Sequence, residues 1–214
     1  DESVNITGLT TGATVEFRGI PAGVGGVNED IAQVVMTDAA LSTTDILNIV
    51  LNADLAADAN NNSQVTAKVG VAGINTINVT ANDRVNDVTD DDLTAAADVA
   101  DNGAGDGYTL VLSNTANVNT INVAGSSFVN YTMSVGTDAA TLLDASASTG
   151  NFTTSVAAFA GTQRIEVKGS QGVNDITGSG LAFGEKITGG AKGDSITGGA
   201  GADDMTGNGG RDYF

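Results

Sequence analysis

The stretch that decides the fold is Gly198-Gly199-Ala200-Gly201-Ala202-Asp203-Asp204-Met205-Thr206. It fits the nonapeptide pattern G-G-x-G-x-D-x-U-x, in which U is a large apolar residue, and repeats of this pattern form parallel β-rolls that bind calcium. The nine residues before it, 189–197, and the eight residues after it, 207–214, keep an aspartate and an apolar residue in the same phase. Tandem units that keep the same residues at the same spacing predict a fold in which the chain forms the same coil again and again.

Two further units precede these three. Residues 180–188 carry Glu185 at the acidic position, and residues 169–177, after a slip of two residues, carry Asn174. Every unit places an oxygen-bearing side chain two residues before a large apolar one. The apolar residues are Ile176, Ile187, Ile196, Met205 and Phe214. Because a single coil cannot bury a core without neighbours, we expect each unit to form a tight turn and a short strand whose apolar residue points inward.

Two units complete one coil, so units two apart are predicted to lie above one another at about the strand separation of a sheet, roughly 4.8 Å. This stacks Asp194 on Asp212 along one edge and Glu185 on Asp203 along the other. Asn174 lies over Asp194 if a loop absorbs the slip. Two carboxylates about 5 Å apart repel by roughly 3 kcal/mol at an effective dielectric constant of 20, whereas a Ca²⁺ ion between them attracts both and takes about 6–8 oxygens.

The sequence therefore predicts calcium as the cofactor. The predicted ligands are the stacked side chains and turns whose glycines permit positive φ and close backbone approach, so that carbonyl oxygens can face an ion. The predicted site residues are Asn174, Glu185, Asp194, Asp203, Asp212, Gly190, Gly199, Gly201 and Gly210. Lys192, which replaces a glycine, and the residues at 174 and 185 depart from the pattern, so we expect weak or empty sites there. The alternative, an acidic glycine-rich linker, needs no apolar residue in phase.

The composition of the chain changes near residue 160. Residues 161–214 hold 15 of the 29 glycines, whereas residues 1–160 are rich in Val, Ile, Thr, Asn and Asp. Short runs of alternating apolar and polar residues in this first part are typical of strands. We divide the chain into a β-rich repeat region, 1–160, and a calcium-binding β-roll, 161–214, which we expect to continue past residue 214.

A longer repeat runs through the first region. The segment Ile74–Val79 recurs as Val118–Val123 after 44 residues, and Arg164–Val167 keeps its last apolar pair after another 44. Strands that recur in one phase predict coils or sheets that are stacked in register.

Signals for helix are weak. Residues 90–99 begin with acidic residues and continue with alanine, which suits one short helix. Residues 45–54 fit a helix or a strand, and we favour a strand because Tyr108–Leu112 precedes the second copy of the long repeat as Ile46–Leu51 precedes the first. The predicted fold class is all-β: a parallel β-roll, or β-solenoid, at the C-terminus, stacked strands upstream, and at most one or two short helices.

Composition limits the function. The chain has 26 acidic and 8 basic residues, a formal net charge of −18, so a nucleic acid or an anionic membrane is a poor partner. There is no Cys and no His, and the remaining oxygen donors suit hard cations such as calcium. No apolar run approaches the length of a membrane span. Without His the commonest general base is missing, and we expect no enzymatic activity.

These patterns resemble a known family. The nonapeptides resemble those of RTX proteins, which bacteria export by type I secretion, and residues 45–52, 69–81 and 142–152 are similar to RTX-type S-layer proteins. The resemblance implies secretion, calcium-triggered folding outside the cell, and a structural role at the cell surface with self-association in a lattice. A cell-surface polysaccharide is a further candidate partner. The alternatives are a stalk or ligand-binding region of an RTX adhesin, and the secretion and folding module of an exported RTX enzyme.

Overall fold

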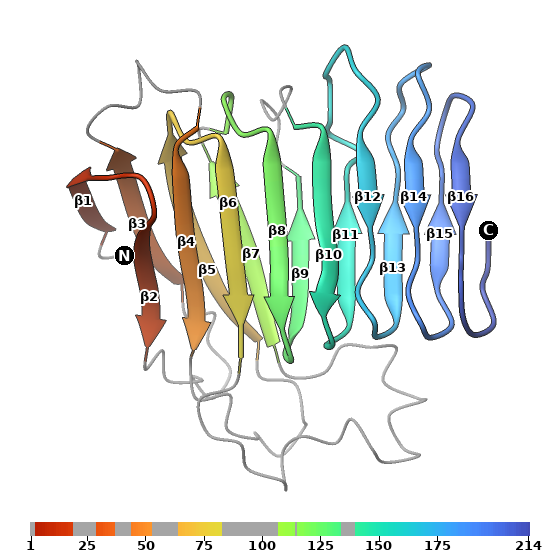
Figure 1. Cartoon of the computed structure of the whole chain (residues 1–214), viewed down its shortest axis with the longest axis horizontal. Coiled ribbons are helices and arrows are strands. Elements are labelled where there is room, and N and C mark those ends of the chain that lie inside the picture. Colours follow the sequence, from red (N-terminus) through yellow and green to blue (C-terminus); the bar gives the residue numbers. More distant parts are fainter. Residues whose placement is uncertain are drawn as a thin grey trace, which may run out of the picture.

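The chain is a parallel β-solenoid built from two facing sheets (Figure 1). The computed structural model describes residues 3–18, 29–36, 44–52, 64–82, 107–113, 115–133 and 140–214. Within these residues successive strands alternate between the two sheets, so each coil contributes one strand to each sheet, and no helix is present. The all-β prediction is confirmed, and the helix predicted at 90–99 lies outside the described residues.

Both sheets have eight parallel strands. Sheet A consists, in spatial order, of β1 (Ser3–Leu9), β3 (Glu29–Met36), β5 (Gln64–Ala72), β7 (Gly107–Ser113), β9 (Phe128–Thr132), β11 (Phe152–Ser155), β13 (Asn174–Thr177) and β15 (Ser195–Thr197). Sheet B consists of β2 (Ala13–Arg18), β4 (Ile46–Asn52), β6 (Thr76–Ala81), β8 (Thr120–Gly125), β10 (Leu142–Ser148), β12 (Glu166–Lys168), β14 (Lys186–Thr188) and β16 (Asp204–Thr206).

The first 44-residue repeat is one full coil. Strands β6 and β8 pair in register, and Nδ2 of Asn122 donates a hydrogen bond of 2.9 Å to Oδ1 of Asn78, 44 residues before it. The third copy does not lie in the next coil. Strand β10 lies between β8 and β12, with Leu143 paired to Ile121 on one side and to Val167 on the other. The second 44-residue spacing therefore covers two coils and is out of register.

Residues 46–52 form the strand β4 as predicted, but the reason for that prediction was wrong. Strand β4 pairs with β6 in sheet B, whereas Tyr108–Leu112 lies in β7 of sheet A. The two segments that precede the copies of the repeat are therefore not equivalent. The counterpart of β7 in the preceding coil is β5, with which it pairs from Gln64 to Gly70.

The core lies between the two sheets. Side chains alternate along each strand, so that Leu47, Ile49 and Leu51 of β4 are buried while the residues between them are half-buried on the outer face. One apolar cluster of this kind extends from Val15 to Ile196. Both sheets cross residue 160 without a break, because β10 pairs with β12 and β11 pairs with β13. The division of the chain into two regions stays a prediction.

The coils nearest the C-terminus are the shortest, although the length does not fall steadily, since the coil between β4 and β6 spans 30 residues. Side chains that bond the coil before them reach back 44 residues at Asn122, 24 residues at Lys168 and 20 residues at Lys186, and at Asp203 the spacing is 18 residues. The strands shorten as well, from seven residues in β4 to three in β14. The spacing of 18 residues agrees with the prediction that two nonapeptides complete one coil.

Candidate metal centre

The turns between strands form two edges of the solenoid (Figure 1). We call the turns that lead into sheet A the first edge; in the glycine-rich part these are residues 169–174, 189–194 and 207–212. The turns that lead into sheet B are the second edge, here residues 178–185 and 198–203. Each of these five turns ends on one of the predicted oxygen ligands, which are Asn174, Asp194, Asp212, Glu185 and Asp203.

The first edge stacks its three predicted ligands. The backbone N–H and Nδ2 of Asn174 both donate to Oδ1 of Asp194, at 2.8 Å each, and the N–H of Asp194 donates to Oδ1 of Asp212 at 3.0 Å. Oδ2 of Asp194 accepts the N–H of Gly190, at the start of its own turn, at 2.6 Å. Asn174 and Asp194 are almost completely buried. Each acidic side chain therefore ties its own turn to the coil before it.

The second edge stacks Glu185 on Asp203. The N–H of Glu185 donates to Oδ1 of Asp203 at 2.8 Å, while the carboxylate of Glu185 accepts the hydroxyl of Ser179 at 2.5 Å and its N–H at 3.3 Å. Burial raises the pKa of Glu185, the hydrogen bonds from Ser179 oppose this, and the neighbouring Asp203 carboxylate raises it again, so the net shift is upward. The two acids are thus close enough to disfavour a second negative charge.

A glycine at the start of each turn makes room for the side chain at its end. A Cβ on Gly189 would collide with Oδ2 of Asp194, and a Cβ on Gly178 would approach Oε2 of Glu185. The full set is Gly169, Gly178, Gly189, Gly198 and Gly207. These glycines were not among the predicted site residues, and the unit that carries Glu185 begins at 178 rather than 180. The repeated Gly-Ser pair at 169–170 and 178–179 was the signal for this frame.

The four predicted glycines also lie in these turns. Gly199, Gly201 and Gly210 have positive φ values of 92°, 108° and 96°, a conformation that strongly favours glycine. Gly190 does not have a positive φ; there a side chain would collide with the carbonyl oxygen of Ser170 in the preceding coil. The expected positive φ is confirmed at three positions, and close backbone approach explains the fourth.

The five turns are of two kinds. In residues 169–174 and 178–185 a serine follows the first glycine, and its hydroxyl binds the side chain at the end of the turn at 3.0 and 2.5 Å. The other three turns have glycine or asparagine at that position. Within residues 140–214, Asp203 and Asp212 each accept one hydrogen bond, on Oδ1, from the coil before. Because a carboxylate has about four lone-pair sites, these two acids keep the largest capacity to bind an ion.

The donor set fits a hard cation. Carboxylate, amide and turn carbonyl oxygens line both edges, without imidazole or thiolate, and such oxygens suit calcium. The described residues contain no group of three or more acidic side chains placed around one point. An ion at either edge would therefore take one or two carboxylates and complete its shell from turn carbonyls.

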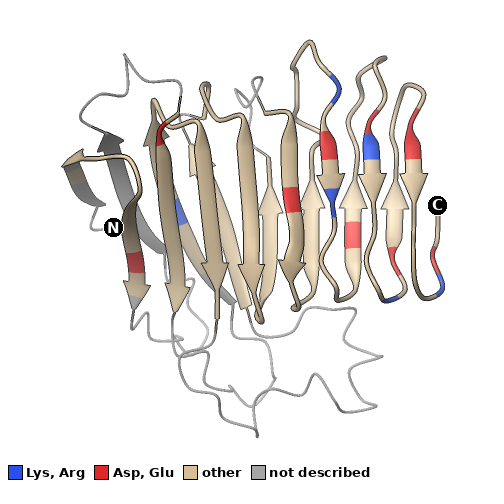
Figure 2. Ribbon diagram, viewed as in Figure 1, with Lys and Arg blue, Asp and Glu red and all other residues tan. Residues whose placement is uncertain are grey.

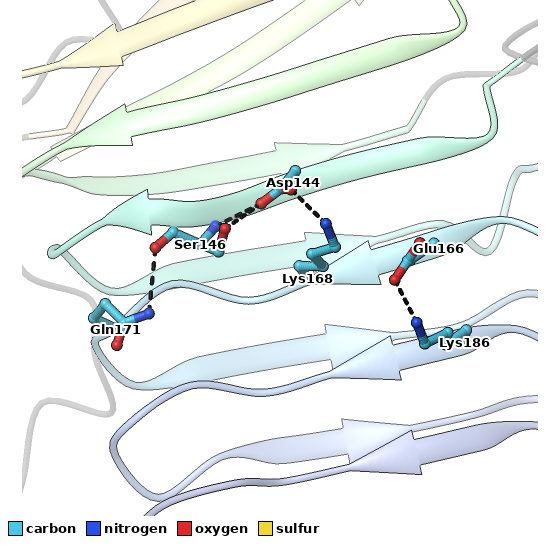
Figure 3. A network of polar contacts seen from close by, with 6 residues as sticks. All are labelled: Asp144, Ser146, Glu166, Lys168, Gln171 and Lys186. Carbon is cyan, nitrogen blue, oxygen red and sulfur yellow. Dashed lines mark hydrogen bonds and ion pairs between the residues drawn. The ribbon is translucent and has the colours of Figure 1, made fainter.

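Two acidic side chains on the outer face of sheet B, those of Asp144 and Glu166, have lysine partners (Figure 3). Figure 2 shows where the charged residues lie along the ribbon. Nζ of Lys168 lies 2.8 Å from Oδ2 of Asp144, and Nζ of Lys186 lies 2.7 Å from Oε1 of Glu166. Burial opposes ionisation of Asp144, but hydrogen bonds from Lys168 and Ser146 outweigh it and hold the pKa of Asp144 below its usual value. These acids are neutralised by lysine and are poor candidates for a metal site.

No helix among the residues that the structure describes is long and apolar enough to cross a membrane. No protein-family model, curated protein or solved structure matches this chain.

Proposed function

We propose that this chain is a structural segment of a secreted bacterial surface protein, in which calcium ions bound along the two edges stabilise the C-terminal coils. The surface location and self-association in a lattice come from the resemblance to RTX-type S-layer proteins. The role is structural rather than catalytic, because the acidic side chains of the array fasten one coil to the next.

One observation carries this proposal: carboxylates from adjoining coils stack on each other at both edges. Asp194 and Asp212 are joined at the first edge, and Glu185 and Asp203 at the second, through side-chain bonds that span 18 residues. Stacked carboxylates repel each other unless a proton or a cation lies between them. Asp203 and Asp212 have the most free lone pairs and would hold the ions, with Asp194, Glu185 and turn carbonyls as further ligands.

The short strands of these coils explain why an ion matters. Strands β14 and β15 each bury one large apolar side chain, Ile187 and Ile196. Each such side chain contributes about 1.5–3 kcal/mol. Coils with so little apolar burial need another source of stability, and calcium binding supplies it because ligands that are assembled only in the folded state couple metal binding to folding.

Hydrogen exchange with and without calcium tests the proposal. In calcium we expect slow exchange of the backbone amides throughout residues 140–214. After chelation, exchange within residues 189–214 is expected to become at least about tenfold faster, because local opening of a coil exposes its amides. Residues 115–133 are expected to keep their protection. Equal protection of residues 189–214 in both conditions would overturn the proposal.

A pair of neighbouring acids provides a matched control. Asp203→Asn removes a charge from the second edge, whereas Asp204→Asn removes one from the outer face, where the side chain of Asp204 is 63 % exposed. We expect only Asp203→Asn to lower the affinity for calcium, by at least about tenfold, since ligand charge sets calcium affinity. Equal effects of the two substitutions would mean that the edge does not bind the ion.

The type of surface protein requires a separate experiment. Ordered two-dimensional assembly of the purified chain that needs calcium would support a surface layer. Binding of the monomeric chain to a defined glycan would instead support an adhesin, and a calcium-dependent coil would then serve as its stalk.

A further inference from the structure

The second edge has a column of equivalent positions that runs well beyond the nonapeptides. The residues in this column are those immediately before the strands of sheet B, which pair in register from β4 to β16. In order, they are Asp45, Asn75, Asn119, Thr141, Ile165, Glu185 and Asp203. Oxygen-bearing side chains thus occupy both ends of the column, and an apolar residue, Ile165, interrupts it near the middle.

The Asp45–Asn75 pair repeats the contacts of the Glu185–Asp203 pair. The N–H of Asp45 donates to Oδ1 of Asn75 at 3.0 Å, as the N–H of Glu185 donates to Oδ1 of Asp203 at 2.8 Å. The backbone carbonyls match as well. The N–H of Thr76 donates to the carbonyl oxygen of Asp45 at 2.9 Å, and the N–H of Asp204 donates to the carbonyl oxygen of Glu185 at 2.8 Å. The two corners therefore have the same backbone and side-chain geometry, although β4 and β6 lie far from the glycine-rich turns.

The amide of Asn75 is held in one orientation. Its Nδ2 donates to the carbonyl oxygen of Asn117 in the next coil at 3.2 Å, so that Oδ1 faces Asp45. The pair thus brings the amide oxygen of Asn75 to the backbone of the acidic residue Asp45 in the adjoining coil.

One oxygen of the Asp45 carboxylate, Oδ2, is buried without a hydrogen-bond partner among the described residues. Asp45 as a whole is 5 % exposed. The equivalent Glu185 differs, because both of its oxygens accept hydrogen bonds from Ser179. Within the described coils no lysine or arginine forms an ion pair with Asp45. A buried carboxylate oxygen without a donor costs free energy, and a cation beside Oδ2 would offset that cost.

We propose that Asp45 and Asn75 form a further divalent-cation site, of the oxygen-only class that takes calcium, at the second edge between β4 and β6. The Asp45 carboxylate supplies the charge, and Oδ1 of Asn75 and carbonyl oxygens of this corner supply neutral ligands. The inference extends the proposed calcium binding to coils without nonapeptides and rests on it only for the choice of ion. With one carboxylate, this site binds more weakly than the acid pairs of the C-terminal coils.

Calorimetric titration of the full chain with calcium chloride tests this site separately from the C-terminal ones. We compare the wild type, Asp45→Asn, and the double variant Asp203→Asn with Asp212→Asn, which disables the nonapeptide edges. Asp45→Asn is expected to bind one ion fewer than the wild type. The double variant is expected to keep one bound ion, and adding Asp45→Asn to the double variant is expected to remove it.

The outcomes separate this inference from the proposed function. If Asp45→Asn binds as many ions as the wild type, or if the double variant binds none, the Asp45 site does not exist while the C-terminal sites stand. If the double variant binds as many ions as the wild type and Asp45→Asn binds one fewer, the Asp45 site stands and the C-terminal sites fail. If no protein binds calcium, both fail.

A gain-of-charge variant guards against loss of folding as the explanation. Asn75→Asp keeps the oxygen that accepts the N–H of Asp45 and turns the corner into an acid pair like that of the C-terminal coils. We expect it to tighten calcium binding at this site by about tenfold or more, because affinity rises with ligand charge. The control Asn78→Asp adds the same charge on the outer face of β6 and is expected to leave the affinity unchanged. Equal affinities of Asn75→Asp and the wild type would overturn the site.

Discussion

The coils of β4–β11 and the coils of β12–β16 share one architecture but are held together differently. The upstream strands β4–β10 each bury at least two apolar residues, such as Leu47, Ile49 and Leu51 in β4. The downstream strands β14 and β15 bury one each, and charged residues gather in this part of the molecule while β6 and β8 have none (Figure 2). The contrast shows that coils with the same strand pairing can be stabilised either by apolar side chains between the sheets or by polar side chains in the turns.

The change takes place at one position of the first edge. Val129 pairs with Phe152, and Phe152 pairs with Asn174, which is bonded to Asp194 in the next coil. The column thus passes from buried apolar side chains to an amide and then to an acid. The amide of Asn174 donates to the acid beside it and carries no charge itself, so it forms a neutral boundary between the two kinds of coil.

The largest expected effect is loss of apolar packing. Ile121→Ala, in the upstream core, is expected to lower the free energy of unfolding by about 2–5 kcal/mol, equally with calcium and with chelator. Ile196→Ala makes the same truncation downstream, where we expect a smaller cost with chelator than in calcium, because the last coils already open more readily without the ion. Urea unfolding in both conditions measures the difference. A calcium-dependent cost at Ile121 would break the comparison.

The next effect tests the tight fit between glycine and acid. Gly189→Ala places a Cβ against the Asp194 carboxylate and the carbonyl of Gly207, and we expect a loss of about 1–3 kcal/mol in thermal unfolding with calcium. Gly180→Ala is the control, since its Cβ would enter open space. If both substitutions cost the same, the glycine is not needed for the acid to fit.

Acid repulsion at the second edge predicts a dependence on pH. Because the pKa of Glu185 is raised in the folded chain, its protonated form stabilises the fold at low pH, and this stability is lost as the pH rises through the folded pKa. In calcium-free buffer we therefore expect the C-terminal coils to be less stable at pH 8 than at pH 5. Glu185→Gln is expected to remove this difference. An unchanged pH profile would show that Glu185 is not the group responsible.

The smallest effect concerns the outer face. Asp144→Asn removes the ion pair with Lys168, which is partly exposed, and is expected to cost about 0.2–1 kcal/mol in dilute salt and less at about 1 M salt. Since the pKa of Asp144 is lowered, this contribution is lost as the pH falls through its folded pKa. The loss of stability is expected to be the same with and without calcium. A strong dependence on calcium would mean that Asp144 takes part in binding the ion.

The sequence predicted the downstream coils better than the upstream ones. A fixed nine-residue spacing determines both phase and coil length, so the stacking of Asp194 on Asp212 followed directly. Upstream, the 44-residue repeat identified β6 and β8 as neighbours but gave no sign of β10, whose sequence Leu142–Ser148 does not repeat theirs. The alternation of apolar and polar residues predicts which side chains point inward. It does not predict which of the two sheets a strand joins when the coils differ in length.

The same limitation hid part of the candidate site. Asp45 and Asn75 are 30 residues apart, and only the register of β4 against β6 shows that they are neighbours. The glycines at the start of each turn were missed for another reason: their role is to leave space, which a pattern of ligands does not reveal. The frame around Glu185 was misplaced because two added residues lie within its turn.

The neutral boundary at Asn174 also gives the folding of the solenoid a direction. In a stacked array each coil contacts only its neighbours, so a coil forms most readily on one that is already ordered. The apolar coils upstream of Asn174 provide such a starting surface, because their last strand in sheet A, β11, is the strand on which β13 pairs. Assembly would then proceed towards the C-terminus, and the concentration of calcium would determine how many rungs are complete at a given moment.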